Sequence, residues 1–71
     1  MFECIMMGLR MKKGISILKF KNRFEEDLLL LYKDVIDKHI NLGNLIIEES
    51  YLKCSNQGFG LLNSILVDFM E

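Results

Sequence analysis

Few residues in this chain of 71 are of types that carry chemistry. The two cysteines, Cys4 and Cys54, lie far apart, and His39 is the single histidine. A structural zinc site needs closely spaced pairs of Cys or His, and a small disulfide-stabilised domain needs more cysteines than two. We therefore expect two reduced, buried thiols and no metal site in the chain.

Basic residues are concentrated in the first third of the chain. Six of the nine lie at or before Arg23, where Glu3 is the one acidic residue, so the front of the chain is positive and the rest is negative. Arg and Lys on a rigid turn are suited to binding carboxylates. The candidate contacts to a ligand or to another domain are Arg10, Lys12, Lys13 and Arg23. The alternative is a solvated surface, on which exposed charges contribute little.

The elements that would position these residues are predicted by hydrophobic spacing. Residues 1–9 show helical spacing, and Gly14 breaks the chain after them. We expect Ile15 to form a one-residue strand and Ser16 to cap a second helix. The second helix carries an apolar stripe made of Ile17, Phe20 and Phe24.

A third helix is predicted from Leu28 to Leu42, with Gly43 as a left-handed C-cap. Its apolar positions recur at helical intervals, and they are Leu28, Leu31, Tyr32, Val35 and Leu42. Three acidic residues stand at its beginning, where the helix dipole favours carboxylates; they are Glu25, Glu26 and Asp27.

The last third of the chain predicts a β-hairpin and a final helix. The strands are expected at 45–48 and 51–54, with a turn at 49–50. Ser55 is placed to cap the last helix, whose apolar side carries Leu62, Ile65, Leu66 and Phe69. The order helix, short strand, helix, helix, hairpin, helix predicts one α+β domain over residues 1–71, of winged-helix type.

The distinctive residues, in this order, resemble the HemN C-terminal domain over essentially the whole chain. The first half of the match is Glu3, Met6-Met7-Gly8-Leu9-Arg10, Gly14, Phe20, Arg23-Phe24, Asp27-Leu28, Tyr32, Ile36 and Gly43. The second half is Leu52, Ser55, Gly58, Leu61, Asn63-Ser64, Val67 and Phe69. The chain departs from the family pattern at His39 and Asn44, where apolar residues are usual, and at Glu25, where Gly is commoner.

The resemblance implies an accessory domain at the end of a radical-SAM protein, either an oxygen-independent coproporphyrinogen III oxidase or a heme chaperone. Such a parent holds a 4Fe-4S cluster and S-adenosylmethionine through a CxxxCxxC motif, which this chain lacks. We expect the chain to be non-catalytic alone, to hold no cofactor and to pack on the catalytic barrel, where it helps close the tetrapyrrole site. For Arg10 this implies a contact with the catalytic domain rather than a contact with the substrate. His39 is expected to be structural, with heme ligation as the alternative.

Two further readings remain open. A winged helix suggests nucleic-acid binding through its third helix, but the exposed residues expected there nearly cancel in charge; they are Lys33, Asp34, Asp37, Lys38 and Asn41. A dimerisation module is the other reading. No apolar run is long enough to span a bilayer, and no signal-peptide pattern opens the chain, so a cytoplasmic protein without membrane contact is expected.

Overall fold

The computed structural model describes residues 1–70. Helix α1 (Phe2–Leu9) buries Ile5 and Leu9, and it lies directly against strand β1 (Ile15–Ser16). Gly8 makes this close approach possible, because a methyl group there would overlap the side chain of Ile15. The predicted first helix and the short strand at Ile15 are both confirmed.

Helix α2 (Ile17–Phe24) has a side-chain cap at its first turn and a left-handed residue after its last turn. The Ser16 hydroxyl accepts a hydrogen bond from the Lys19 N–H at 3.1 Å, so the predicted N-cap is confirmed. At the other end Glu25 adopts a left-handed conformation, with φ of 56°. Glycine adopts this backbone conformation without the steric cost that a side chain such as that of Glu25 carries.

The three strands form one antiparallel sheet in the order β1-β3-β2. Strands β2 (Leu45–Glu48) and β3 (Tyr51–Cys54) are the predicted hairpin, and Ile15 of β1 pairs with Leu52. Glu49 and Ser50 both have positive φ, 51° and 66°. Two left-handed residues between antiparallel strands make the type of turn whose twist matches that of the hairpin.

The predicted third helix is two helices, α3 (Leu28–Leu31) and α4 (Lys33–Asn41), so the expectation of one continuous helix is wrong. Tyr32 separates them with φ of −118° and ψ of 36°. Its ring lies edge-on to Phe69, with centroids 5.2 Å apart, so a tertiary contact accompanies the break. Two of the apolar positions assigned to the stripe, Leu31 and Leu42, are exposed. The other boundaries hold: the Asp27 side chain caps α3, and Gly43 has φ of 81°.

The last helix is also divided, into α5 (Asn56–Gly60) and α6 (Leu62–Met70), where one helix was predicted. The break falls at Leu61, after a segment with two glycines, and glycine is a poor helix former. Gly58 is required because a methyl group there would overlap the backbone oxygen of Asn44. The Ser55 cap is confirmed, since its hydroxyl accepts from the Gly58 N–H at 3.0 Å.

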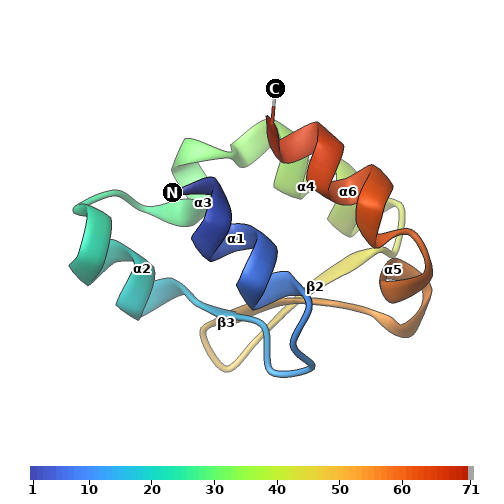
Figure 1. The fold of residues 1–71 in the computed structure, drawn as a ribbon, viewed down its shortest axis with the longest axis horizontal. Helices are drawn as coiled ribbons and strands as arrows, with labels where there is room; N and C mark the ends of the chain where they lie inside the picture. Colours follow the sequence, from blue (N-terminus) through green and yellow to red (C-terminus); the bar gives the residue numbers. More distant parts are fainter. Residues whose placement is uncertain (71) are drawn as a thin grey trace.

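The sheet lies along one side of the molecule, and the helices cover its other side (Figure 1). Helix α1 runs across the middle and contacts α6, β1 and β3, while α2 and α5 lie at opposite ends. One core joins all these elements; its buried apolar residues are Ile5, Leu9, Ile15, Phe20, Leu28, Ile36, Leu45, Leu52, Cys54, Ile65, Leu66 and Phe69. The predicted small α+β domain is therefore confirmed.

Candidate functional site

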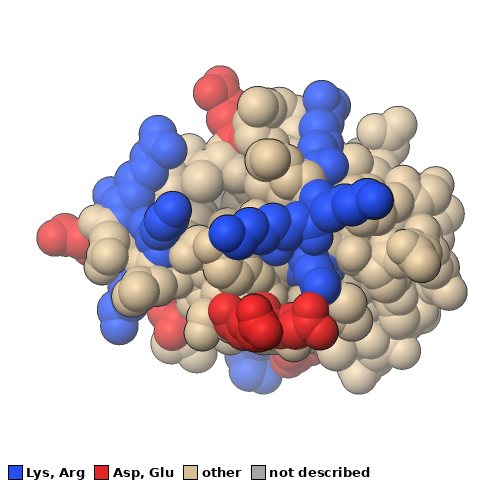
Figure 2. Space-filling model, turned by 90° about the horizontal axis from the view of Figure 1, so that it is seen from below, with Lys and Arg blue, Asp and Glu red and all other residues tan. Residues whose placement is uncertain are grey.

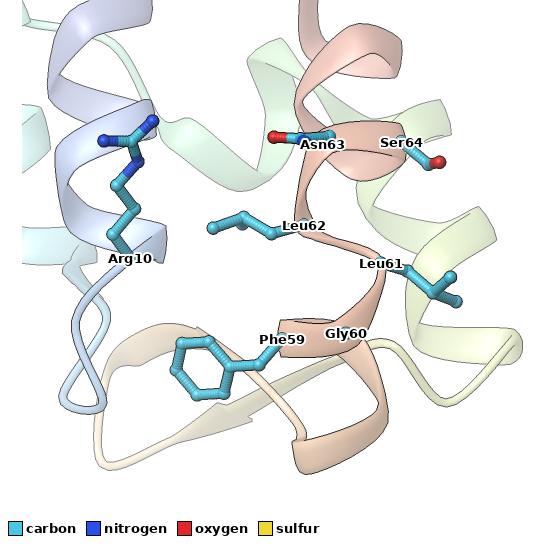
Figure 3. A pocket seen from close by; sticks show the side chains of 7 residues that line it. All are labelled: Arg10, Phe59, Gly60, Leu61, Leu62, Asn63 and Ser64. Carbon is cyan, nitrogen blue, oxygen red and sulfur yellow. The ribbon is translucent and has the colours of Figure 1, made fainter.

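A hollow of about 430 Å³ separates the end of α1 from the junction of α5 and α6. Figure 3 shows the Arg10 side chain on one side of it and Phe59 and Leu62 pointing toward it from the other. Leu61 points away, on the opposite flank of the junction. At the break, the junction of α5 and α6 thus presents side chains on two flanks.

Helix α5 and the residues next to it in sequence include no charged side chain. Residues 54–67 contain no Asp, Glu, Lys or Arg, and neither do residues 39–47. The second segment is held against α5, because the Gln57 amide donates to the Leu42 carbonyl at 3.0 Å and the Ser55 hydroxyl donates to the Gly43 carbonyl. Leu42 and Leu61 are 55% and 46% exposed. We call this surface, formed by α5, Leu42 and Leu61, the α5 face.

Charged side chains border the α5 face at Arg10, Lys12 and Lys53, which line the hollows beside Phe59. Seen from below, Lys and Arg spread over the left and middle, acidic side chains gather beside them, and the part on the side of α5 is largely free of charge (Figure 2). Apolar surface that is left in contact with water on a small domain marks a site of interaction. The α5 face, with Arg10 at its edge, is the surface of this kind that adjoins a predicted site residue.

The four basic residues predicted as a site do not come together. Arg10 and Lys12 both adjoin Phe59, each lining a hollow beside it. Lys13 lies over the Tyr51 ring, 5.1 Å from its centroid. Arg23 lies over the Phe24 ring at 5.2 Å and lines a separate hollow between α1 and α2. Of the predicted set, only Arg10 and Lys12 therefore border the surroundings of α5.

His39 is buried and belongs to a chain of hydrogen bonds that sequence analysis did not find. Its Nε2 lies 2.7 Å from an Asp68 carboxylate oxygen, and its Nδ1 lies 3.0 Å from the Asn44 amide nitrogen. The Asn44 oxygen accepts from Gln57, 2.8 Å away. Lys38 also donates to Asp68, at 3.1 Å. Both ring nitrogens are thus engaged inside the protein, and a metal would have to displace one of these partners.

The Leu42 carbonyl, at the outer end of this chain of hydrogen bonds, determines which group donates and which accepts at each step. The Leu42 carbonyl can only accept, so the Gln57 amide nitrogen faces it and also donates to Asn44. Asn44 then turns its NH₂ group to His39, whose Nδ1 must accept and whose Nε2 must donate to Asp68. The network ties α4 to α5 and α6, and it leaves no buried side-chain nitrogen or oxygen of residues 1–70 without a partner.

Among residues 1–70, the pKa values of three side chains are shifted. The hydrogen bond from His39, followed by that from Lys38, lowers the pKa of Asp68. The hydrogen bond from Lys53, at 2.6 Å, lowers the pKa of Glu48. Burial raises the pKa of the Cys54 thiol, so that Cys54 is a poor nucleophile near neutral pH.

Within residues 1–70, no three His, Cys, Asp or Glu residues gather in a group that could hold a metal ion. Cys4 and Cys54 are free thiols, the first partly buried and the second buried. No helix of the same residues is long and apolar enough to cross a membrane.

Helix α4, the helix considered for nucleic-acid binding, has its lysines paired with acids. Lys33 bonds to Asp37 at 3.2 Å within the helix, and Lys38 bonds to Asp68 at 3.1 Å. Neutralising phosphates requires a coherent basic surface. The pairing on α4 does not favour a role of this helix in the groove of a duplex.

Two comparisons with known proteins give a match. The family model described as the HemN C-terminal domain matches residues 1–61. The heme chaperone HemW of Lactococcus lactis subsp. lactis (strain IL1403) is 31% identical over 68 residues, which cover 96% of this chain and 18% of that protein. No solved structure gives a significant match. The resemblance found in the sequence is therefore confirmed, and the chain belongs to the HemN C-terminal domain family.

Proposed function

We propose that this chain acts as the accessory C-terminal domain of a HemN- or HemW-like radical-SAM protein of heme or porphyrin metabolism. In this role it is not catalytic alone. It packs through the α5 face on the catalytic domain and helps close the tetrapyrrole site. The 4Fe-4S cluster and S-adenosylmethionine belong to the catalytic domain. Membership of the HemN C-terminal domain family supports the accessory role, and the similarity to a heme chaperone supports the link to heme.

The single observation that carries the docking surface is the exposed, uncharged α5 face on a domain that corresponds to 18% of its relative's length. The core of a protein interface is depleted in charged residues. Arg10 stands at the edge of the α5 face, where an acidic residue of the catalytic domain would pair with its guanidinium. Two free thiols fit a reducing, cytoplasmic setting.

A spectroscopic mapping experiment tests the docking surface. The Lactococcus heme chaperone is truncated before its own C-terminal domain, and circular dichroism establishes that the remainder is folded. The nitrogen-15-labelled chain is then titrated with it. We expect saturable changes at Arg10, Leu42, Gln57 and Leu61. Changes confined to α2 and α3, or none at all, would contradict the proposal.

The role in closing the tetrapyrrole site requires the catalytic domain, so its test uses a fusion protein. The choice between an oxidase and a chaperone also depends on the catalytic domain. The chain is fused to the truncated chaperone, and heme binding is measured with and without the fused domain. Tighter binding in the fusion is the expected result. An identical affinity in the two proteins would remove the closing role and leave the docking role standing.

A further inference from the structure

A second hollow, also of about 430 Å³, opens between α1, β1 and α2. Ile15 and Phe20, both buried, form its floor, and the partly buried Cys4 lies in its wall. The exposed lining is mostly carbon, unlike that of the hollow beside Arg10. Helix α2 lies at the opposite end of the molecule from α5 (Figure 1), and this hollow shares no lining residue with the hollow beside Arg10, so it is separate from the α5 face.

Two cations lie at this hollow, Lys19 and Arg23. They stand four residues apart on α2, a spacing at which like charges face each other and destabilise a helix. Neither forms an ion pair with another of residues 1–70. Helix α2 contains no acidic residue that would offset them. An anion between these two side chains would remove the repulsion.

We propose that this hollow binds a small molecule that has an apolar body and a carboxylate. The body lies on Ile15 and Phe20, and the carboxylate lies between Lys19 and Arg23. Guanidinium and ammonium groups form charge-assisted hydrogen bonds with carboxylates, and the apolar floor excludes water from the remainder of the ligand. The same chemistry is offered by an alkyl carboxylate and by a propionate on an aromatic ring. The site does not depend on docking of the α5 face.

Titration of the labelled chain tests this site and separates the two sources. The probes are laurate below its micelle concentration, coproporphyrin III, and dodecanol, which has the apolar body without the carboxylate. We expect at least one of the two acids to give saturable changes at the Gly8 and Ile15 amides, and the alcohol to bind roughly tenfold more weakly or not at all. The acid that binds more tightly shows whether the ligand is an alkyl carboxylate or a propionate on an aromatic ring. Equal binding of the alcohol, or no saturable change with either acid, would overturn the proposal.

Matched variants extend the test. Lys19→Gln combined with Arg23→Gln should weaken acid binding by roughly tenfold to a hundredfold. Lys21→Gln, on the same helix but outside the hollow, should leave it unchanged. The bound acid should also slow alkylation of Cys4 by iodoacetamide, while the buried Cys54 reacts slowly with or without it. Equal weakening by Lys21→Gln, or unprotected Cys4, would show that the ligand lies elsewhere.

Discussion

The buried pair of His39 and Asn44 should show strong energetic coupling. Asn44→Leu keeps the side chain close in size but removes the donor that lies 3.0 Å from His39 Nδ1. The His39 side chain is 5% exposed, so water cannot replace that donor. An unsatisfied buried acceptor destabilises a protein by about 1–3 kcal/mol. The Gln57 amide loses one acceptor but is exposed and still donates to Leu42, so it adds little.

This loss is a large part of the free energy of unfolding of the whole chain. At about 0.05–0.15 kcal/mol per residue, a chain of this length is stable by roughly 4–11 kcal/mol. Each kcal/mol should lower the melting temperature by about 4–8 °C. Urea unfolding followed by circular dichroism measures the free energy directly. Asn41→Leu, at an exposed position of α4, is the matched control and should change it by less than about 0.5 kcal/mol.

The double variant decides whether the reasoning is right. In His39→Leu/Asn44→Leu no buried partner is left unsatisfied, and Asp68 remains bonded to Lys38. Replacing both partners of a buried hydrogen bond by apolar groups is close to neutral. The double variant should therefore be more stable than the sum of the single changes by about 1 kcal/mol or more. Strict additivity, or an effect of Asn44→Leu no larger than that of Asn41→Leu, would refute the proposed network.

Three further predictions concern single positions. Because the pKa of Asp68 is lowered, the stability that its carboxylate contributes is present above the ordinary pKa of 3.8 and is lost as the pH falls through the lowered value. Urea unfolding between neutral and strongly acidic pH should therefore show a smaller loss of unfolding free energy for Asp68→Asn than for the original chain. The same loss in both proteins would contradict this. Gly60→Ala should stabilise the fold by about 0.4–1 kcal/mol, since nothing lies within 4 Å of the added methyl group. Gly58→Ala should destabilise the fold, because the added methyl group overlaps Asn44. Thermal melts in which both variants shift the melting temperature in the same direction would be inconsistent with the packing. Glu25→Gly should raise the melting temperature, because Glu25 has φ of 56°, and a lower value would argue that its side chain stabilises the fold.

Sequence rules predicted the features that depend on neighbouring residues. The caps at Ser16 and Ser55 each use a side-chain oxygen three residues from its donor. The hairpin follows from two β-rich runs separated by two residues. Features of this range are set before distant parts of the chain meet, and the structure reproduces them.

The helix breaks and the His39 network were beyond the reach of the sequence. Hydrophobic periodicity continues through a single non-helical residue, so Tyr32 and Leu61 looked like parts of continuous helices. The partner of His39 at its Nε2 is Asp68, 29 residues away, and no spacing rule relates them. An isolated histidine and an unusual asparagine were visible as departures from the family pattern, but their pairing was not.

Proximity in sequence also misled the prediction of one basic site. Arg10 is the C-cap of α1, whereas Lys13 lies in the turn between α1 and β1, where it meets Tyr51 of the hairpin. Arg23 lies a full helix further on. The uncharged stretch at 54–67 was the sequence signal for the α5 face, and a search for segments without charge would have found it.

The most direct test of the docking role is the affinity of the chain for the truncated chaperone, measured by titration calorimetry for three proteins. Leu61→Asp places a charge on the α5 face, and Leu30→Asp places one at a leucine of α3 that is 72% exposed. Burying an unpaired charge at the centre of an interface should weaken binding by about 30-fold or more. Loss with Leu61→Asp and retention with Leu30→Asp is the predicted result. Retention with Leu61→Asp, or loss with Leu30→Asp alone, would contradict docking through the α5 face.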